Sequence, residues 1–102
     1  RVMASSFGGG LAEYVTAAAG SVSRLPVNMG FAQAAGFRVN YLTALHGLRD
    51  RAGLQPGERL LVFGAAGGVG TAAVQVGRLL GAEVIAVAST AEKRAFAMAH
   101  GA

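Results

Sequence analysis

The feature that most constrains this chain is a glycine-rich turn, Gly64-Ala-Ala-Gly-Gly-Val-Gly70, which lies between an apolar run at residues 60–63 and a segment of small residues. Glycines permit left-handed backbone angles in such a turn and remove Cβ atoms where the backbone must approach another group closely. A strand, a glycine turn and a helix in this order are typical of sites that bind the diphosphate of a dinucleotide. The sequence therefore predicts a nucleotide cofactor, with the amides of Val69, Gly70 and Thr71 directed at its phosphates.

The segments on either side complete a βαβ pattern. Residues 60–63 and 84–88 are continuously apolar, as expected of parallel strands that are buried on both faces. Between them, apolar residues at helical spacing predict a helix, in which Gly77 allows close packing on the sheet and after which Gly81 forms the cap. The apolar positions are Val69, Ala72, Ala73, Val76 and Leu80.

Two other interpretations of the glycine turn stay open. A phosphate-loop NTPase needs Lys and then Ser or Thr after the last glycine, whereas Gly70 is followed by Thr71-Ala72-Ala73. The other alternative is an α/β domain whose turn binds no nucleotide, since glycine makes up 16 of the 102 residues and some clustering is expected. The complete βαβ context favours the dinucleotide site over both.

The residues after the second strand indicate which dinucleotide is bound. NAD sites usually place Asp or Glu about 20 residues beyond the glycines, but this stretch reads Ala-Ser-Thr-Ala-Glu-Lys-Arg, with no acid at the strand tip. Ser89 and Thr90, either of which can also cap a helix at residues 91–99, are able to donate to a 2′-phosphate, and Lys93 supplies positive charge. Arg94 is either a second positive charge at this site or a solvated side chain. The sequence thus favours NADPH over NADH.

The rest of the chain precedes this nucleotide region. Short strands are expected before residue 25, around the Gly8-Gly9-Gly10 turn, with Tyr14 and Val15 in strand conformation. Two helical segments follow, a short one at residues 31–36 and a longer one from Val39, closed by Gly53 and the Pro56-Gly57 turn. In the longer helix, an apolar stripe is expected to pack in the core. Its members are Tyr41, Leu45 and Leu48.

Composition excludes several classes of function. The net charge of +4 comes from scattered arginines with no basic, aromatic-interleaved patch, so no nucleic-acid partner is expected. There is no cysteine for a disulfide and no apolar run of membrane length. We therefore predict a cytoplasmic protein without a membrane partner.

A longer block, from Leu54-Gln-Pro-Gly-Glu-Arg-Leu to Gly-Gly-Val-Gly-Thr-Ala-Ala-Val-Gln75, resembles the quinone oxidoreductase (zeta-crystallin-like) branch of the medium-chain dehydrogenase/reductase superfamily. The resemblance extends upstream to the Gly9-to-Val15 segment, to Leu25-Pro26 and to the Asn40-to-Leu45 segment. It implies an α/β fold in three parts. These are the trailing strands of a GroES-like catalytic domain (residues 1–27), connecting helices (28–57) and the first βαβα half of a Rossmann-type parallel sheet (58–102).

The same resemblance implies an NADPH-dependent enzyme that transfers hydride to a quinone or another conjugated carbonyl compound. Thr43 matches the family's Thr at the nicotinamide end, so it joins the predicted cofactor contacts. The others are Gly67, Gly68, Val69, Gly70, Ser89, Thr90 and Lys93. No catalytic residue is assigned, because the family's oxyanion-stabilising groups lie mainly in the preceding domain. An enoyl reductase of fatty-acid or polyketide synthesis and a non-catalytic NADPH-binding protein are the alternatives.

Zinc-dependent alcohol dehydrogenases are relatives in the same superfamily. Where they carry a zinc ligand shortly before the Thr, this chain has Val39 and Asn40, and His46 and His100 have no partner at ligand spacing. A zinc-independent enzyme is expected.

We also expect the chain to be an internal fragment whose full-length form is a homodimer. With 53% hydrophobic and 14% charged residues, two parallel strands alone should leave apolar sheet edges exposed.

Overall fold

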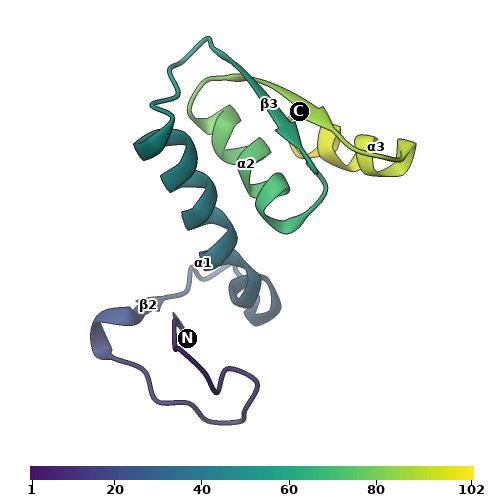
Figure 1. Ribbon diagram of the computed structural model, residues 1–102. Coiled ribbons are helices and arrows are strands. Elements are labelled where there is room, and N and C mark those ends of the chain that lie inside the picture. Colours follow the sequence, from purple (N-terminus) through teal and green to yellow (C-terminus); the bar gives the residue numbers. More distant parts are fainter. The chain divides into compact units, whose positions relative to one another are not determined.

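The computed structural model describes residues 1–102 (Figure 1). The chain contains two compact units, Arg1–Ala35 and Gly36–Ala102. The first unit is largely irregular, whereas the second contains a parallel strand pair with helices. The mixed α/β architecture agrees with the fold class predicted from the sequence.

In the first unit, strands β1 (Val2–Ala4) and β2 (Val22–Arg24) pair in antiparallel fashion, with Met3 opposite Ser23. A 3₁₀ turn, η1 (Ala19–Ser21), leads into β2. Short strands therefore lie before and after the Gly8-Gly9-Gly10 turn, as predicted, but Tyr14 and Val15 are outside any strand, contrary to the prediction. Strand preference depends on pairing and burial, and the Tyr14 side chain is 91% exposed.

One helix, α1 (Phe31–Leu45), occupies the region where two segments were predicted. Gly36 does not interrupt it, because one internal glycine costs only about 1 kcal/mol relative to alanine and alanines precede it. The helix continues into a π-helical segment, η2 (His46–Arg51). Gly53 then adopts a φ of +62°, which confirms the predicted end of the helical region.

The second unit has the predicted βαβα order. Strands β3 (Arg59–Phe63) and β4 (Glu83–Val87) are parallel and paired from Arg59 opposite Glu83 to Phe63 opposite Val87. Helix α2 (Gly68–Leu79) connects them and lies alongside the strand pair in Figure 1. Helix α3 (Ala91–Ala99) follows β4 at the predicted bounds.

Helix α2 contributes to two apolar clusters. Val74 is fully buried in the cluster that contains Val62 and Val84 of the strands. Ala72 and Val76 belong to the other cluster with Ala44. The stripe predicted for the longer helix packs against this second cluster and is partly buried; its members are Tyr41, Leu45 and Leu48.

Gly77 allows the close approach of α2 to the strands, as predicted. A Cβ at this position would lie 2.6 Å from Leu60 Cδ2 and 3.1 Å from Val84 Cγ2. The C-cap of α2 is Leu80, and Gly81, with a φ of +86°, is the left-handed residue that follows the cap and ends the helix.

The strands are buried on one face only, which corrects the prediction of burial on both. Val62 and Val84 point into the core, whereas the alternate side chains remain open to solvent. The open positions are Leu61 (51% exposed), Phe63 (73%), Ile85 (43%) and Val87 (37%). The exposed apolar surface is therefore a sheet face and not only an edge.

None of the helices combines the length and the apolar character that crossing a bilayer would require.

Candidate nucleotide-binding site

The glycine turn connects β3 to α2 at the carboxyl end of the parallel pair. Gly64 adopts a φ of +62°, which favours glycine. At Gly70 a Cβ would overlap the Gly64 carbonyl oxygen and approach Ala65 Cα to 2.9 Å. The turn therefore needs glycine at both positions: Gly64 because of its backbone angle, and Gly70 because a side chain would have no room.

Backbone hydrogen bonds define which amides of the turn remain available. The Thr71 amide donates to the Gly67 carbonyl at 2.8 Å, so it is not directed at a ligand, contrary to the prediction. Helix α2 begins earlier than expected, with Gly67 as its N-cap. The first-turn amides are those of Gly68, Val69 and Gly70, which precede the first i→i−4 bond. Amides in this position, with the positive end of the helix dipole behind them, are able to bind an anion.

A cavity of about 300 Å³ lies beside this turn, at the carboxyl ends of both strands. It is lined by Gly64, Ala66, Gly67, Ala88, Ser89 and Lys93. The structure thus brings together the glycine turn and the β4–α3 turn, which are about 20 residues apart in sequence. Ligands of open parallel sheets bind at this edge of the sheet.

The polar residues predicted at the β4–α3 turn differ in what they contact. Thr90 is the N-cap of α3, and its Oγ1 accepts a hydrogen bond from the Lys93 amide at 3.2 Å. Ser89 and Lys93 line the cavity, and the Lys93 ammonium forms no salt bridge within the chain. Arg94 donates from Nη1 to the Ala88 carbonyl at 3.1 Å, so it is not simply a solvated side chain.

Thr43 does not join this group of residues. It is an exposed residue on α1 and is not part of the cavity lining. Asn40, one turn earlier, instead lies against the glycine turn, because a Cβ on Gly68 would come within 2.8 Å of Asn40 Nδ2. The sequence placed Asn40 in the segment that resembles the family and excluded it as a zinc ligand, but it did not predict this contact, which only the packing of α1 on α2 creates.

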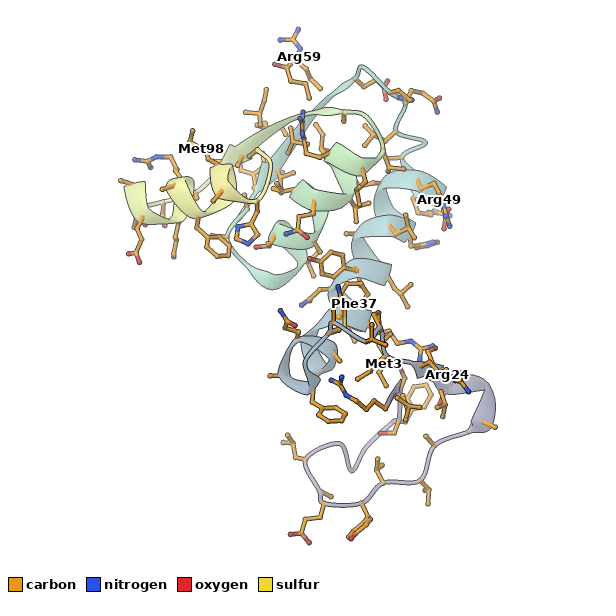
Figure 2. All side chains as sticks on the ribbon, turned by 180° about the vertical axis from the view of Figure 1, so that it is seen from behind. Met3, Arg24, Phe37, Arg49, Arg59 and Met98 are labelled. Carbon is orange, nitrogen blue, oxygen red and sulfur yellow. The ribbon has the colours of Figure 1, made fainter.

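One side-chain hydrogen bond joins α1 to α2, and another lies within α1. The Tyr41 hydroxyl donates to Gln75 Oε1 at 2.5 Å, and Phe37, labelled in Figure 2, stacks on the Tyr41 ring at 4.3 Å. Asn40 Nδ2 donates to the Gly36 carbonyl at 2.9 Å. The helix that carries Asn40 is thereby fixed against the helix whose N-terminus faces the cavity.

Asp50 and His100 lie outside the cavity and have polar partners within the chain. Asp50 contacts Arg49 at 2.6 Å and His46 at 3.1 Å. These hydrogen bonds, that of Arg49 first, lower the pKa of the Asp50 carboxyl. His100 Nδ1 lies 2.8 Å from the Phe96 carbonyl. No three His, Cys, Asp or Glu side chains converge as metal ligands.

Known proteins with similar sequences include quinone oxidoreductases and polyketide synthases. The human quinone oxidoreductase is 40% identical over 98 residues, which are 96% of this chain and 30% of that protein. The spectinabilin polyketide synthase system protein NorB of Streptomyces orinoci is 55% identical over 71 residues, 70% of this chain and 3% of that protein. The chain thus spans less than a third of the length of these relatives. No family model matches the chain.

Solved structures similar to this chain include quinone oxidoreductases, an enoyl reductase and an NAD-dependent alcohol dehydrogenase. The quinone oxidoreductase of Thermus thermophilus, also solved in complex with NADPH, matches with a TM-score of 0.88 and 46% identity. This match covers 94% of this chain and 32% of that one. The CurK enoyl reductase matches with a TM-score of 0.73 and 45% identity over 78% of this chain and 24% of that one.

Proposed function

The chain belongs to the quinone oxidoreductase branch of the medium-chain dehydrogenase/reductase superfamily, and from this we propose that the protein is an NADPH-dependent oxidoreductase. The observation that carries the proposal is the cavity in which the glycine turn meets Ser89 and Lys93. Homologous quinone oxidoreductases have been crystallised with NADPH.

The residues around the cavity fit a phosphorylated dinucleotide. The Gly67 backbone lines the cavity without a side chain, and the first-turn amides of α2 supply donors for the diphosphate. Ser89 supplies a hydroxyl and Lys93 an unpaired ammonium at the tip of β4, where an NAD site usually carries a carboxylate. Thr90 Oγ1 already accepts the hydrogen bond that caps α3. The Thr90 hydroxyl group would therefore act toward a 2′-phosphate as a donor.

When bound, NADPH would supply the hydride. The part of this chain is to bind and orient the cofactor. The fixed amides of Gly68, Val69 and Gly70 hold the diphosphate without reorganisation, and Lys93 offsets the charge of the 2′-phosphate. We further propose that Thr43 contacts the nicotinamide end, a role taken from the family resemblance alone.

We propose a quinone or another conjugated carbonyl compound as the acceptor. The enoyl reductases are a second candidate class, favoured specifically by the 55% identity to NorB and the match to the CurK enoyl reductase. A non-catalytic NADPH-binding protein is the third. Each of the three requires the same cofactor site, so the acceptor is what separates them.

Zinc independence is part of the proposal. Asn40 occupies the region of a family zinc ligand; its side-chain amide donates to the Gly36 carbonyl and lies against Gly68. An amide in this arrangement is a poor ligand for zinc, which prefers thiolate, imidazole and carboxylate. The homodimer, the cytoplasmic location and the lack of nucleic-acid and membrane partners remain predictions.

The test uses the full-length protein. NADPH oxidation is followed with a panel of quinones, with simple conjugated enones and with enoyl thioesters, after Kd values for NADPH and NADH have been measured by calorimetry. Activity with quinones supports the proposed acceptor, and activity confined to enoyl thioesters favours the second class. NADPH binding without turnover of any acceptor identifies the non-catalytic class. The absence of heat with either coenzyme would contradict the cofactor site itself.

A further inference from the structure

The Arg94 side chain turns back across the N-terminus of its own helix. Its backbone amide donates to the Thr90 carbonyl at 3.0 Å, in the first turn of α3. Its guanidinium Nη1 donates to the Ala88 carbonyl at 3.1 Å, six residues earlier and outside the helix. Arg94 therefore connects α3 directly to the end of β4.

This contact completes a set of hydrogen bonds that fix the β4–α3 turn. The Val87 carbonyl accepts from the Ala65 amide of the glycine turn at 3.2 Å. The Ala88 carbonyl accepts from Arg94, and Thr90 Oγ1 accepts from the Lys93 amide. Ser89 lies between these fixed residues and lines the cavity, as does Ala88.

The charge of Arg94 has a second consequence at the cavity. A carbonyl oxygen carries partial negative charge, which repels an anionic group nearby. Because Ala88 lines the cavity, pairing its carbonyl with a permanently charged guanidinium offsets that repulsion. Arg94 thus brings a positive charge to the backbone of the β4–α3 turn, in addition to the charge of Lys93 at the cavity.

From this geometry we propose that Arg94 is a positioning residue for the 2′-phosphate of NADPH. It fixes the Ala88–Ser89 backbone and neutralises the Ala88 carbonyl, so that Ser89 and Lys93 meet the phosphate in a prearranged, electropositive turn. The inference rests on the proposed function, since it assumes that the cavity binds the adenosine end of NADPH. It predicts that Arg94 contributes to the choice between NADPH and NADH.

The test compares Arg94→Met, Arg94→Lys and the control Arg59→Met in the full-length protein. Arg59 is exposed at the amino end of β3, whereas the cavity lies at the carboxyl end, and Figure 2 shows its side chain pointing away from the sheet. Its substitution by Met changes the net charge by the same amount as Arg94→Met. Kd values for NADPH and NADH are measured at low and high salt, with the melting temperature of each variant. Arg94→Met is expected to lower the NADPH preference about two- to fivefold, the range for an exposed ionic contact.

Arg94→Lys keeps the charge and one donor, so it should retain more of the preference than Arg94→Met, and Arg59→Met should leave it unchanged. The loss in Arg94→Met should shrink at high salt. An unchanged preference in Arg94→Met, or an equal loss of affinity for both coenzymes, would overturn the inference while leaving the proposed function intact. A wild-type protein without NADPH preference would instead refute the cofactor assignment, and the inference with it.

Discussion

Gly70 and Gly36 are both helical glycines, but they differ in the space around them. A Cβ on Gly70 would overlap the Gly64 carbonyl oxygen, whereas one on Gly36 would meet nothing within 4 Å. Gly70→Ala is expected to lower the free energy of unfolding by about 1–3 kcal/mol through overpacking and to weaken NADPH binding by displacing the turn. Gly36→Ala is expected to raise the free energy of unfolding by about 0.5–1 kcal/mol.

Urea unfolding of both full-length variants, together with calorimetric NADPH titration, measures these effects. Gly36→Ala serves as the matched control because it adds the same methyl group to a helix distant from the turn in sequence. Equal stability of Gly70→Ala and wild type would show that the turn accommodates a side chain, contrary to the structure.

Asp50 permits a prediction about pH at the level of a single residue. Its folded-state pKa lies below the ordinary value of 3.8, chiefly because it accepts a hydrogen bond from Arg49. The stabilisation from this contact is therefore present above that value and is lost as the pH falls through the lowered pKa. NMR titration of the Asp50 carboxyl should give a midpoint below 3.8, and Arg49→Gln should raise it. A midpoint that Arg49→Gln leaves unmoved would contradict this cause.

At the scale of elements, Gly77 sets how closely α2 packs on the strands. A methyl group there would contact Leu60 Cδ2 and Val84 Cγ2. Gly77→Ala is expected to destabilise the fold by about 1–3 kcal/mol. In a Leu60→Ala background the cost should be smaller, because the nearer of the two contacts is removed.

A double-mutant cycle by denaturant unfolding measures this coupling. The matched cycle pairs Gly77→Ala with Leu79→Ala, a substitution on α2 at a side chain that is 85% exposed. Additive effects in the Leu60 cycle would indicate that α2 and β3 are not in contact through these two residues.

The elements themselves follow closely from the sequence where local signals agree. The apolar runs at residues 60–63 and 84–88 predicted β3 and β4, because a short, continuous apolar run that is bounded by turn residues is typical of a buried strand. Thr90 and Lys93 define the start of α3 through a local hydrogen bond, so α3 was predicted at its observed bounds. The segment around Tyr14 was predicted wrongly, because strand formation needs a partner that local preference does not reveal.

At the scale of the whole molecule, the open face of the strand pair determines how the isolated chain should behave. Leu61 and Phe63 are more than half exposed beside Ile85 and Val87, and contiguous apolar surface of this kind promotes association. We expect the 102-residue chain alone to self-associate in a concentration-dependent way. Sedimentation velocity should show less association for Leu61→Thr/Phe63→Thr, since threonine is compatible with a strand.

Leu79→Thr is the control, because Leu79 is exposed on α2 away from the open face. It should leave the association of the chain nearly unchanged. A wild-type chain that sediments as a monomer across the concentrations tested would contradict the prediction.

The sequence by itself determined the βαβα order, the glycine turn and the polar residues at the tip of the second strand, because these depend on local periodicity and backbone chemistry. Only the tertiary structure decided which amides of the turn stay free, that Ser89 and Lys93 line one cavity with Gly67, and that Arg94 binds the Ala88 carbonyl. It also placed Asn40 and not Thr43 beside the turn. These contacts depend on where elements distant in sequence pack, which local preferences do not specify.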